Sequence, residues 1–355
     1  MLTRRLFLEM AGAAATLRAS FAAVPDEGLR AIAARRGILY GCAAATYELK
    51  DSTFAAALAQ EAAILSAEYE MKRAAIEPVR GSYDFSGGDG LLAFARAHGM
   101  SFRGHTLVWH HSNPPWLEDA LQSADAEAFL TNYIAAVAGH YEGRVTSWDV
   151  VNEVLQPQDG RADGLRNSFW LKRFGPEYID LAFHTARSAA PHAMLVYNDW
   201  GCELGAPDND RFRAATLKFL DDALARGVPI HALGMQGHLS AFGTQVDQKK
   251  LSAFLEAVRR MGLKILVTEH DVDDSGGPLD VAVRDRAVAD ASRRFLDVML
   301  DNPATIAVLT WGLSDRFIDP PGWRDRLAGR YPRMLPLDSD CARKPMWRAM
   351  AKAFA

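Results

Sequence analysis

The sequence has few cysteines, little net charge and no long apolar segment. Its three cysteines, Cys42, Cys202 and Cys341, lie far apart, which disfavours a metal knuckle or a disulfide-dense scaffold but leaves one disulfide or three free thiols open. The formal net charge of -4 provides no basic field that would attract phosphate backbones or anionic lipid. We therefore expect no nucleic-acid partner.

The first two dozen residues differ in composition from the rest. Arg4 and Arg5 precede an Ala-rich apolar run, which a stretch of small residues follows. The run is roughly a dozen residues long and contains Glu9, whereas a membrane span needs about 20 apolar residues. A basic amphipathic helix or a membrane anchor are the alternatives. We expect residues 1–23 to be a twin-arginine signal peptide that directs export to the periplasm or the medium.

Residues 24–355 alternate short apolar runs with longer amphipathic stretches, without a break in composition. The pattern predicts eight strands, at 38–44, up to Glu68, and at 102–109, 145–153, 194–200, 232–239, 264–272 and 305–313. Helices are predicted at 53–65, 90–99, 125–141, 176–190, 208–227, 248–262, 280–300 and 345–354. Eight such units favour an α/β fold with a single (β/α)8 TIM barrel. A doubly wound sheet is the alternative, but no Gly-rich nucleotide turn follows any strand.

Polar and aromatic side chains gather at the C-terminal ends of these strands. In a TIM barrel these ends form one rim, and the active site lies there. Each residue alone has a plain structural explanation, but burying so many unpaired polar groups would cost several kcal/mol. The joint pattern therefore indicates a site, with the residues Glu68, His105, Trp109, Asn152, Glu153, Asn198, Asp199, Gln236, His238, Glu269, Asp271 and Trp311.

The rim also lacks several kinds of catalytic motif. No Ser or Cys stands in a nucleophile elbow, and HxH and HExxH spacings are absent. His110 and His111 are expected to point to opposite faces of an extended segment, which disfavours a metal site. We expect no metal and no cofactor. Carboxylates surrounded by amides, imidazoles and Trp rings suit glycoside hydrolysis, for which Glu153 and Glu269 are the best candidates.

Five motifs of the chain resemble those of a known family. GHTLVWH (104–110), WDVVNE (148–153), QGHL (236–239), VTEHDV (267–272) and WGLSD (311–315) are similar to signatures of glycoside hydrolase family 10, the retaining endo-beta-1,4-xylanases, which are TIM barrels. The resemblance runs from about Glu68 to Pro345, so it covers most of the chain after the signal.

The resemblance implies a role for each residue of the rim. Glu153 would be the general acid/base and Glu269 the nucleophile. Asp271 would orient His238, which touches Glu269, and Glu68 would support the site. Residue alternation places Glu269 and Asp271 on one face, and His270, expected to be structural, on the other. The residues implied to line the sugar site are Lys72, His105, Trp109, Asn152, Gln236, His238 and Trp311.

The chain departs from the family pattern at four positions that concern substrate binding. Tyr69 replaces an Asn that holds the second glycone sugar, and Arg73 replaces a Trp. Ser112 stands where a Gln is usual, and Asp319 where a Trp covers the glycone sugars, with Trp323 as a candidate substitute. None of these changes falls on the two carboxylates. They predict retained chemistry with an altered glycone pocket.

Two other functions stay open at this point. A silent sugar-binding barrel should have lost a carboxylate, and this chain retains both. A retaining beta-glycosidase of the same fold that acts on another beta-linked glycan or glycoside is the stronger alternative. The expected partner is a xylan-type polysaccharide or oligosaccharide, bound by a monomer with no membrane span in the mature chain. Endo action and exo action are not separated by the sequence.

Overall fold

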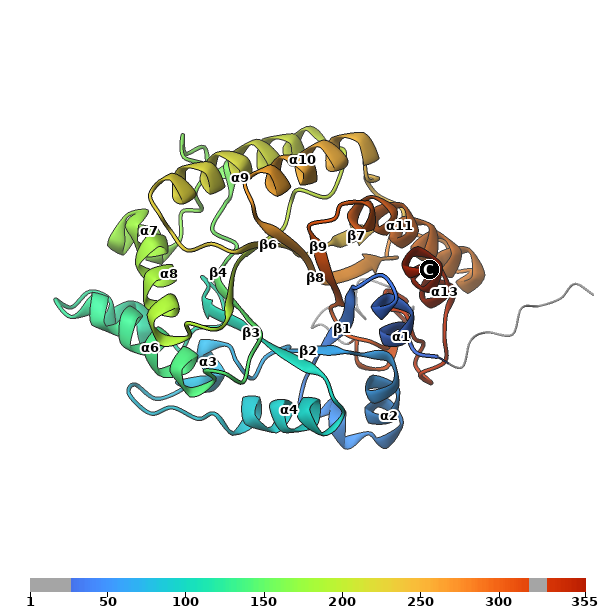
Figure 1. Cartoon of the computed structure of the whole chain (residues 1–355), viewed down its shortest axis with the longest axis horizontal. Helices are drawn as coiled ribbons and strands as arrows, with labels where there is room; N and C mark the ends of the chain where they lie inside the picture. Colours follow the sequence, from blue (N-terminus) through green and yellow to red (C-terminus); the bar gives the residue numbers. More distant parts are fainter. Residues whose placement is uncertain (1–26, 319–330) are drawn as a thin grey trace, which may run out of the picture.

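The computed structural model describes residues 27–318 and 331–355. Within these ranges parallel strands form a closed ring with helices around it (Figure 1). β6 and β7 both pair with β8, so they share one place and the barrel has eight, as predicted. The strands are β1 Leu39–Ala44, β2 Ile64–Ala67, β3 Ser101–Val108, β4 Ser147–Asn152, β5 Met194–Asp199, β6 Ala232–Met235, β7 His238–Ser240, β8 Lys264–Asp273 and β9 Thr305–Thr310.

The longer outer helices follow the predicted amphipathic stretches, although the helix predicted at 90–99 begins already at Ser86. The helix predicted at 53–65 ends at Glu61, because Ile64 already pairs with Gly41 of β1. Four short helices, at 29–34, 73–76, 117–120 and 169–174, were not predicted, since four to six residues are too few to show a period. The helices are α1 Leu29–Ala34, α2 Ser52–Glu61, α3 Arg73–Ile76, α4 Ser86–Ala97, α5 Leu117–Ala120, α6 Ala126–His140, α7 Phe169–Phe174, α8 Glu177–Ala189, α9 Pro207–Ala225, α10 Gln248–Arg260, α11 Val281–Asp301 and α13 Pro345–Phe354.

The core has an inner and an outer part, because side chains alternate between the two faces of each strand. On β8, Leu266 points into the barrel, while Ile265 and Val267 pack against the helices. The larger outer cluster lies between strands and helices. The inner cluster is small, which leaves room for polar groups above it at the rim; it comprises Ile64, Val196, Ala232, Leu266, Ala307 and Leu309.

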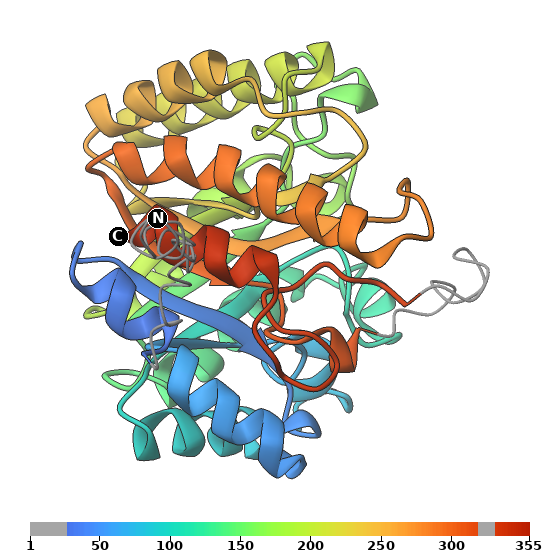
Figure 2. The same cartoon turned by 90° about the vertical axis from the view of Figure 1, so that its right-hand side faces the viewer.

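The two ends of the barrel differ in character. In the side view of Figure 2 the C-terminus lies at one end and the loop before α11 at the other, where the strands end. After β9, Asp315 accepts a hydrogen bond from Lys344 at 2.6 Å, which fixes the chain before α13. The predicted signal peptide at 1–23 lies outside the described residues, as do Asp319 and Trp323. Among the described helices, none has the length and apolar character that a membrane crossing requires.

A buried carboxylate joins the first and last helices at the end of the barrel opposite the rim. Glu61, which is 2% exposed, accepts hydrogen bonds at 2.7 Å from the backbone N of Leu29 and at 2.9 Å from Trp347 Nε1. Arg343 lies 2.8 Å from its other oxygen and 4.0 Å above the Trp347 ring. Glu61 therefore links α1, α2 and α13, which are far apart in the sequence.

We predict that Glu61→Ala lowers the free energy of unfolding by about 3 kcal/mol, because it leaves buried donors without a partner. Urea denaturation followed by circular dichroism measures the change. Glu256→Ala is the control. That side chain pairs with Arg259 and Arg260 on an exposed face, so its loss should cost much less than the loss of Glu61. Equal effects of the two substitutions would contradict the prediction.

Candidate active site

Glu153 directly follows β4 in a backbone conformation that is rare for residues other than glycine. Its φ is 56°, in the left-handed region, which costs of order 1–3 kcal/mol and persists only where neighbours hold it. Its N–H donates to the Asn198 carbonyl at 2.9 Å, and its carbonyl accepts from Arg166 Nε at 2.7 Å. The Leu155 N–H donates to Asp199 Oδ2 at 3.1 Å. These bonds hold the turn that directs Glu153 into the rim.

The Glu153 carboxyl group has few charged neighbours. Gln236 Nε2 donates to its Oε1 at 3.0 Å, and His110 Nε2 lies 3.9 Å from its Oε2. Burial, with the nearby charges of Arg166 and His111, lowers the pKa of His110 to about 3, so that imidazole is neutral near pH 7. The carboxyl side chain is 15% exposed and so remains partly accessible to solvent. It can therefore exchange a proton with a bound molecule.

Glu269 reaches the rim through an irregularity in β8. The register between β8 and β9 shifts between Val267 and His270. As a result two consecutive side chains contact the same residue, because Thr268 Oγ1 donates to Asn198 Oδ1 at 2.6 Å and Glu269 Oε1 accepts from Asn198 Nδ2 at 2.8 Å. In a regular strand these two side chains would lie on opposite faces, so the bulge re-aims Glu269.

The surroundings of Glu269 keep its carboxylate ionised. The residue is 6% exposed, and burial by itself would raise its pKa. The hydrogen bonds from His238 Nε2 at 3.3 Å and from Asn198, with the charges of His238 and of His105 3.9 Å away, outweigh burial and lower the pKa of Glu269 to about 2. A buried carboxylate that stays charged is a candidate nucleophile.

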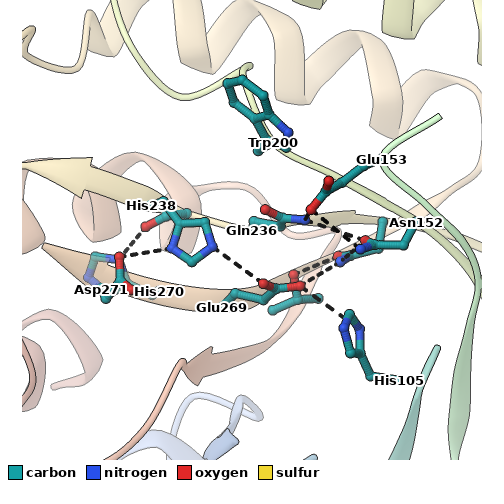
Figure 3. Close-up of polar contacts among 12 residues, drawn as sticks. His105, Asn152, Glu153, Trp200, Gln236, His238, Glu269, His270 and Asp271 are labelled. Carbon is teal, nitrogen blue, oxygen red and sulfur yellow. Dashed lines mark hydrogen bonds and ion pairs between the residues drawn. The ribbon is translucent and has the colours of Figure 1, made fainter. Parts of the chain in front are cut away.

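His238 connects this carboxylate to Asp271. Its Nδ1 lies 2.8 Å from Asp271 Oδ1, while its Nε2 faces Glu269 (Figure 3). Burial lowers the pKa of His238, but Asp271 and Glu269 outweigh that effect and raise it well above its ordinary value. The two carboxylates thus hold a charged imidazole in a fixed orientation. This is the arrangement of Asp271, His238 and Glu269 that the resemblance implied.

His270 lies on the opposite face of β8, within the outer core. Its Nδ1 is 2.9 Å from the Gly237 carbonyl, its Nε2 is 2.8 Å from Ser292 Oγ, and its ring packs against Phe295. Burial lowers the pKa of His270 to about 4, so the buried ring is neutral near pH 7. Its contacts fasten β8 to α11, which is the structural role expected for it.

A lysine after β2 and two tryptophans, after β3 and β9, border the carboxylates. Lys72 Nζ lies 5.0 Å from the centre of the Trp109 ring and 5.4 Å from that of Trp311, within the range of cation–π attraction. Burial lowers the pKa of Lys72, while Glu269 and Glu68 oppose that effect. Ammonium and indole groups that border a cleft are suited to sugar hydroxyls and sugar faces.

His105 is held by the buried ion pair of Arg103 and Asp149. Its Nδ1 is 2.9 Å from Asp149 Oδ2, and Arg103 bonds to the other carboxylate oxygen. All three side chains are almost fully buried. Arg103 and Asp149 lie within strands rather than at strand ends, so the strand-end pattern does not include them.

Two further residues of the site were not assigned from the sequence. Asn198 was placed at a strand end without a role, yet its amide joins Asn152 and Glu269, each at 2.8 Å. The sequence held a signal for this contact, because both Asn residues stand at the ends of consecutive strands. In the structure these strands pair so that Asn152 and Asn198 lie opposite one another. Trp200 follows β5 and is 38% exposed beside Glu153 (Figure 3). The sequence signal for Trp200 is its position, since an aromatic residue at a strand end of a barrel lies at the rim.

The expectation that His110 and His111 point to opposite faces is wrong. Their ring centres lie 4.0 Å apart, because the chain turns after β3 and Ser112 has a φ of 52°. No group of three or more His, Cys, Asp or Glu within 27–318 and 331–355 is arranged to hold a metal ion.

The departures from the family pattern have different structural consequences. Tyr69 is 52% exposed after β2, whereas Arg73 is buried, pairs with Glu77 at 2.9 Å and lies 4.2 Å from the centre of the Tyr133 ring. Ser112 contributes its left-handed turn and its carbonyl, which accepts from Ala74 at 2.8 Å. Arg73 is therefore structural, and Tyr69 faces solvent.

The rim thus holds two carboxyl groups in unlike surroundings. Glu269 is buried, charged and supported by donors, while Glu153 is open to the cleft beside Trp200 (Figure 3). Gln236 and Asn198 connect the two through Asn152, with Gln236 Nε2 3.4 Å from Asn152 Oδ1. Such a pair suits acid–base and nucleophilic work at one bond.

Comparison with known proteins places this site in a family. The model of "Glycosyl hydrolase family 10" matches residues 28–353. Endo-1,4-beta-xylanase B of Thermotoga neapolitana is 33% identical over 332 residues, which cover 92% of this chain and 91% of that protein. Endo-1,4-beta-xylanase 1 of Humicola insolens is 30% identical over 285 residues, or 79% of this chain and 62% of that longer protein.

The fold agrees with solved structures as well. The crystal structure of xylanase 10B from Thermotoga petrophila RKU-1 in complex with xylobiose superposes with a TM-score of 0.81 and 29% identity, and the match covers 92% of this chain and 97% of that one. The family match spans nearly all described residues, including both carboxylates of the rim. The chain therefore belongs to glycosyl hydrolase family 10.

Proposed function

We propose that this chain is an endo-1,4-beta-xylanase that hydrolyses beta-1,4-xylosidic bonds in xylan and xylo-oligosaccharides with retention of configuration. The contrast between the charged, buried Glu269 and the cleft-facing Glu153 carries the proposal, because a double displacement needs one nucleophile and one acid/base. The names of the relatives and the xylobiose bound in the Thermotoga petrophila structure support the choice of xylan.

In the first step Glu269 attacks the anomeric carbon while Glu153 donates a proton to the leaving glycosidic oxygen. The bond from the sugar to that oxygen breaks, and a covalent ester to Glu269 forms. In the second step Glu153 takes a proton from water, which displaces Glu269 and restores both groups. Retaining enzymes carry out these steps with the two carboxyl groups ~5–5.5 Å apart.

The surrounding residues bind and orient the sugar in this proposal. Lys72, Trp109 and Trp311 border the reacting sugar next to Glu269. Asn152, held in place by Asn198 at 2.8 Å, is offered to the 2-hydroxyl, where a hydrogen bond strengthens as positive charge develops on the ring. Trp200 provides a stacking surface for the leaving sugar beside Glu153.

The two roles can be separated with an activated substrate, 2,4-dinitrophenyl beta-xylobioside, and azide. We predict that Glu269→Ala lowers kcat/KM at least ~10⁴-fold and that azide yields the inverted glycosyl azide, because azide then replaces the nucleophile. Glu153→Ala should lose about 10²–10⁴-fold on xylan, and azide should yield the retained product.

Proton NMR identifies the anomer formed in each case. Glu127→Ala, on the exposed face of α6, is the control and should leave kcat/KM unchanged. The same anomer from both variants, or full activity in either one, would contradict the assignment of roles.

The pH profile reports on His238. Because His238 helps to lower the pKa of Glu269, we predict that His238→Asn raises that pKa and moves the acid limb of kcat/KM upward by about one pH unit. The sign follows from the mechanism, since Glu269 must be ionised and activity is lost as the pH falls through its pKa. An acid limb that stays in place while kcat falls at every pH would show that His238 acts on position alone.

We also propose that residues 1–23 direct export by the twin-arginine route. The support is the Arg4–Arg5 pair ahead of a short apolar run, which is too short for a membrane span. Fused to a reporter that folds in the cytoplasm, residues 1–30 should carry it to the periplasm, and Arg4→Lys with Arg5→Lys should retain it inside. Export that survives the double substitution would contradict this route.

A further inference from the structure

Two half-exposed tyrosines stand at the ends of neighbouring strands of the barrel. Tyr47 follows β1 and is 54% exposed, and Tyr69 follows β2 and is 52% exposed. The two strands pair in parallel up to Ala44 and Ala67, so their ends lie side by side. Single exposed aromatic residues are ordinary on a surface, but two on adjacent strand ends of a sugar-binding rim form a candidate contact surface.

Hydrogen bonds fix the two loops to one another. Glu70 Oε1 accepts from the N–H of Thr46 at 2.5 Å and from its hydroxyl at 2.8 Å. Lys72 donates its N–H to the Tyr69 carbonyl at 2.9 Å, and Phe317 packs edge-on against the Tyr47 ring with 5.8 Å between ring centres. The loops that bear both tyrosines are therefore held before any ligand binds, which lowers the entropy cost of binding.

The direction of the bound chain follows from the roles of the two carboxylates. The acid/base protonates the leaving oxygen, so the leaving sugar lies toward Glu153 and Trp200, at the ends of β4 and β5. The reacting sugar lies beside Glu269, bordered by Lys72 and Trp311. Further sugars of the glycone then extend away from Glu153, over β9, β1 and β2, which are consecutive in the sheet.

Two carboxylates in this part of the rim are already bonded within the protein, so aromatic side chains are expected to make much of the contact with the glycone. Glu48 is 3% exposed and accepts from its own loop at Ala45, and Glu70 is occupied by Thr46. Tyr69, in contrast, is 52% exposed and directly follows Glu68 in the chain. Aromatic faces bind the apolar face of a pyranose ring without requiring a particular hydroxyl pattern.

We propose that Tyr69, with Tyr47 beside it, forms an aromatic platform that binds the second glycone sugar by stacking. Tyr69 is thus a specificity-determining residue for β-1,4-linked pyranose chains. The inference rests on the proposed function, since that function sets the direction of the chain in the cleft. It gives the altered glycone pocket a physical basis, in which a ring face contributes where the family pattern has an amide.

The test compares two aryl glycosides that differ by one glycone sugar. A 4-nitrophenyl beta-xyloside occupies only the position of the reacting sugar, whereas a 4-nitrophenyl beta-xylobioside also reaches Tyr69. We expect Tyr69→Ala to lower kcat/KM about tenfold on the xylobioside, as loss of an aromatic contact does, and to leave the xyloside within about twofold. Tyr69→Phe keeps the ring and should retain activity on both substrates.

Leu279→Ala serves as a surface control, because Leu279 is 72% exposed on the loop before α11. An equal loss on both substrates, or no loss on either, would overturn the platform. A gain on the xylobioside would overturn it too, because Tyr69 would then obstruct the second sugar. A large loss with Tyr69→Phe would assign the contact to the hydroxyl instead of the ring. A wild-type protein that cleaves neither these glycosides nor xylan would instead overturn the proposed function.

Discussion

The hydrogen bonds of the Asn198 amide are the interaction on which the site depends. Its nitrogen donates to Glu269 and to Asn152, and its oxygen accepts from Thr268, so one side chain on β5 joins β4 and β8. Without this link the bulge in β8 would have no partner to receive two consecutive side chains. The relative position of the Glu153 and Glu269 carboxyl groups is therefore held by contacts to β5, through the Asn198 amide and its backbone carbonyl.

The second constraint is the charge on Glu269. A carboxylate that is 6% exposed would normally take up a proton, since burial penalises the charged form. Here His238 and Asn198 bond to it and outweigh burial, and Asp271 keeps His238 charged and oriented. Glu153 lacks such a set of donors and instead occupies a strained turn at the cleft. One rim thus provides two carboxyl groups with different tasks.

Much of this could be anticipated from the sequence, because periodicity and strand-end chemistry are local. The strand ends and the paired carboxylates lie in short motifs, whereas the contacts of His238 with Asp271 and Glu269 were implied only by the resemblance to the family. The errors arose where local rules fail. A helix ran on into β2, since Ala62 and Ala63 suit either state, and the two adjacent histidines were assumed to lie on an extended segment that in fact turns.

Local patterns in the chain fix the alternation of strands and helices, and with it the barrel and the set of side chains on its rim. The packing of the barrel decides most of the contacts among those side chains, such as those that Asn198 makes with Asn152, Thr268 and Glu269. The bulge that turns Glu269 inward, the positive φ of Glu153 and the reach of Asn198 across the barrel depend on pairing between strands more than 40 residues apart. Contacts of that kind produce no periodic pattern of residue types in the sequence, because they depend on the register between neighbouring strands.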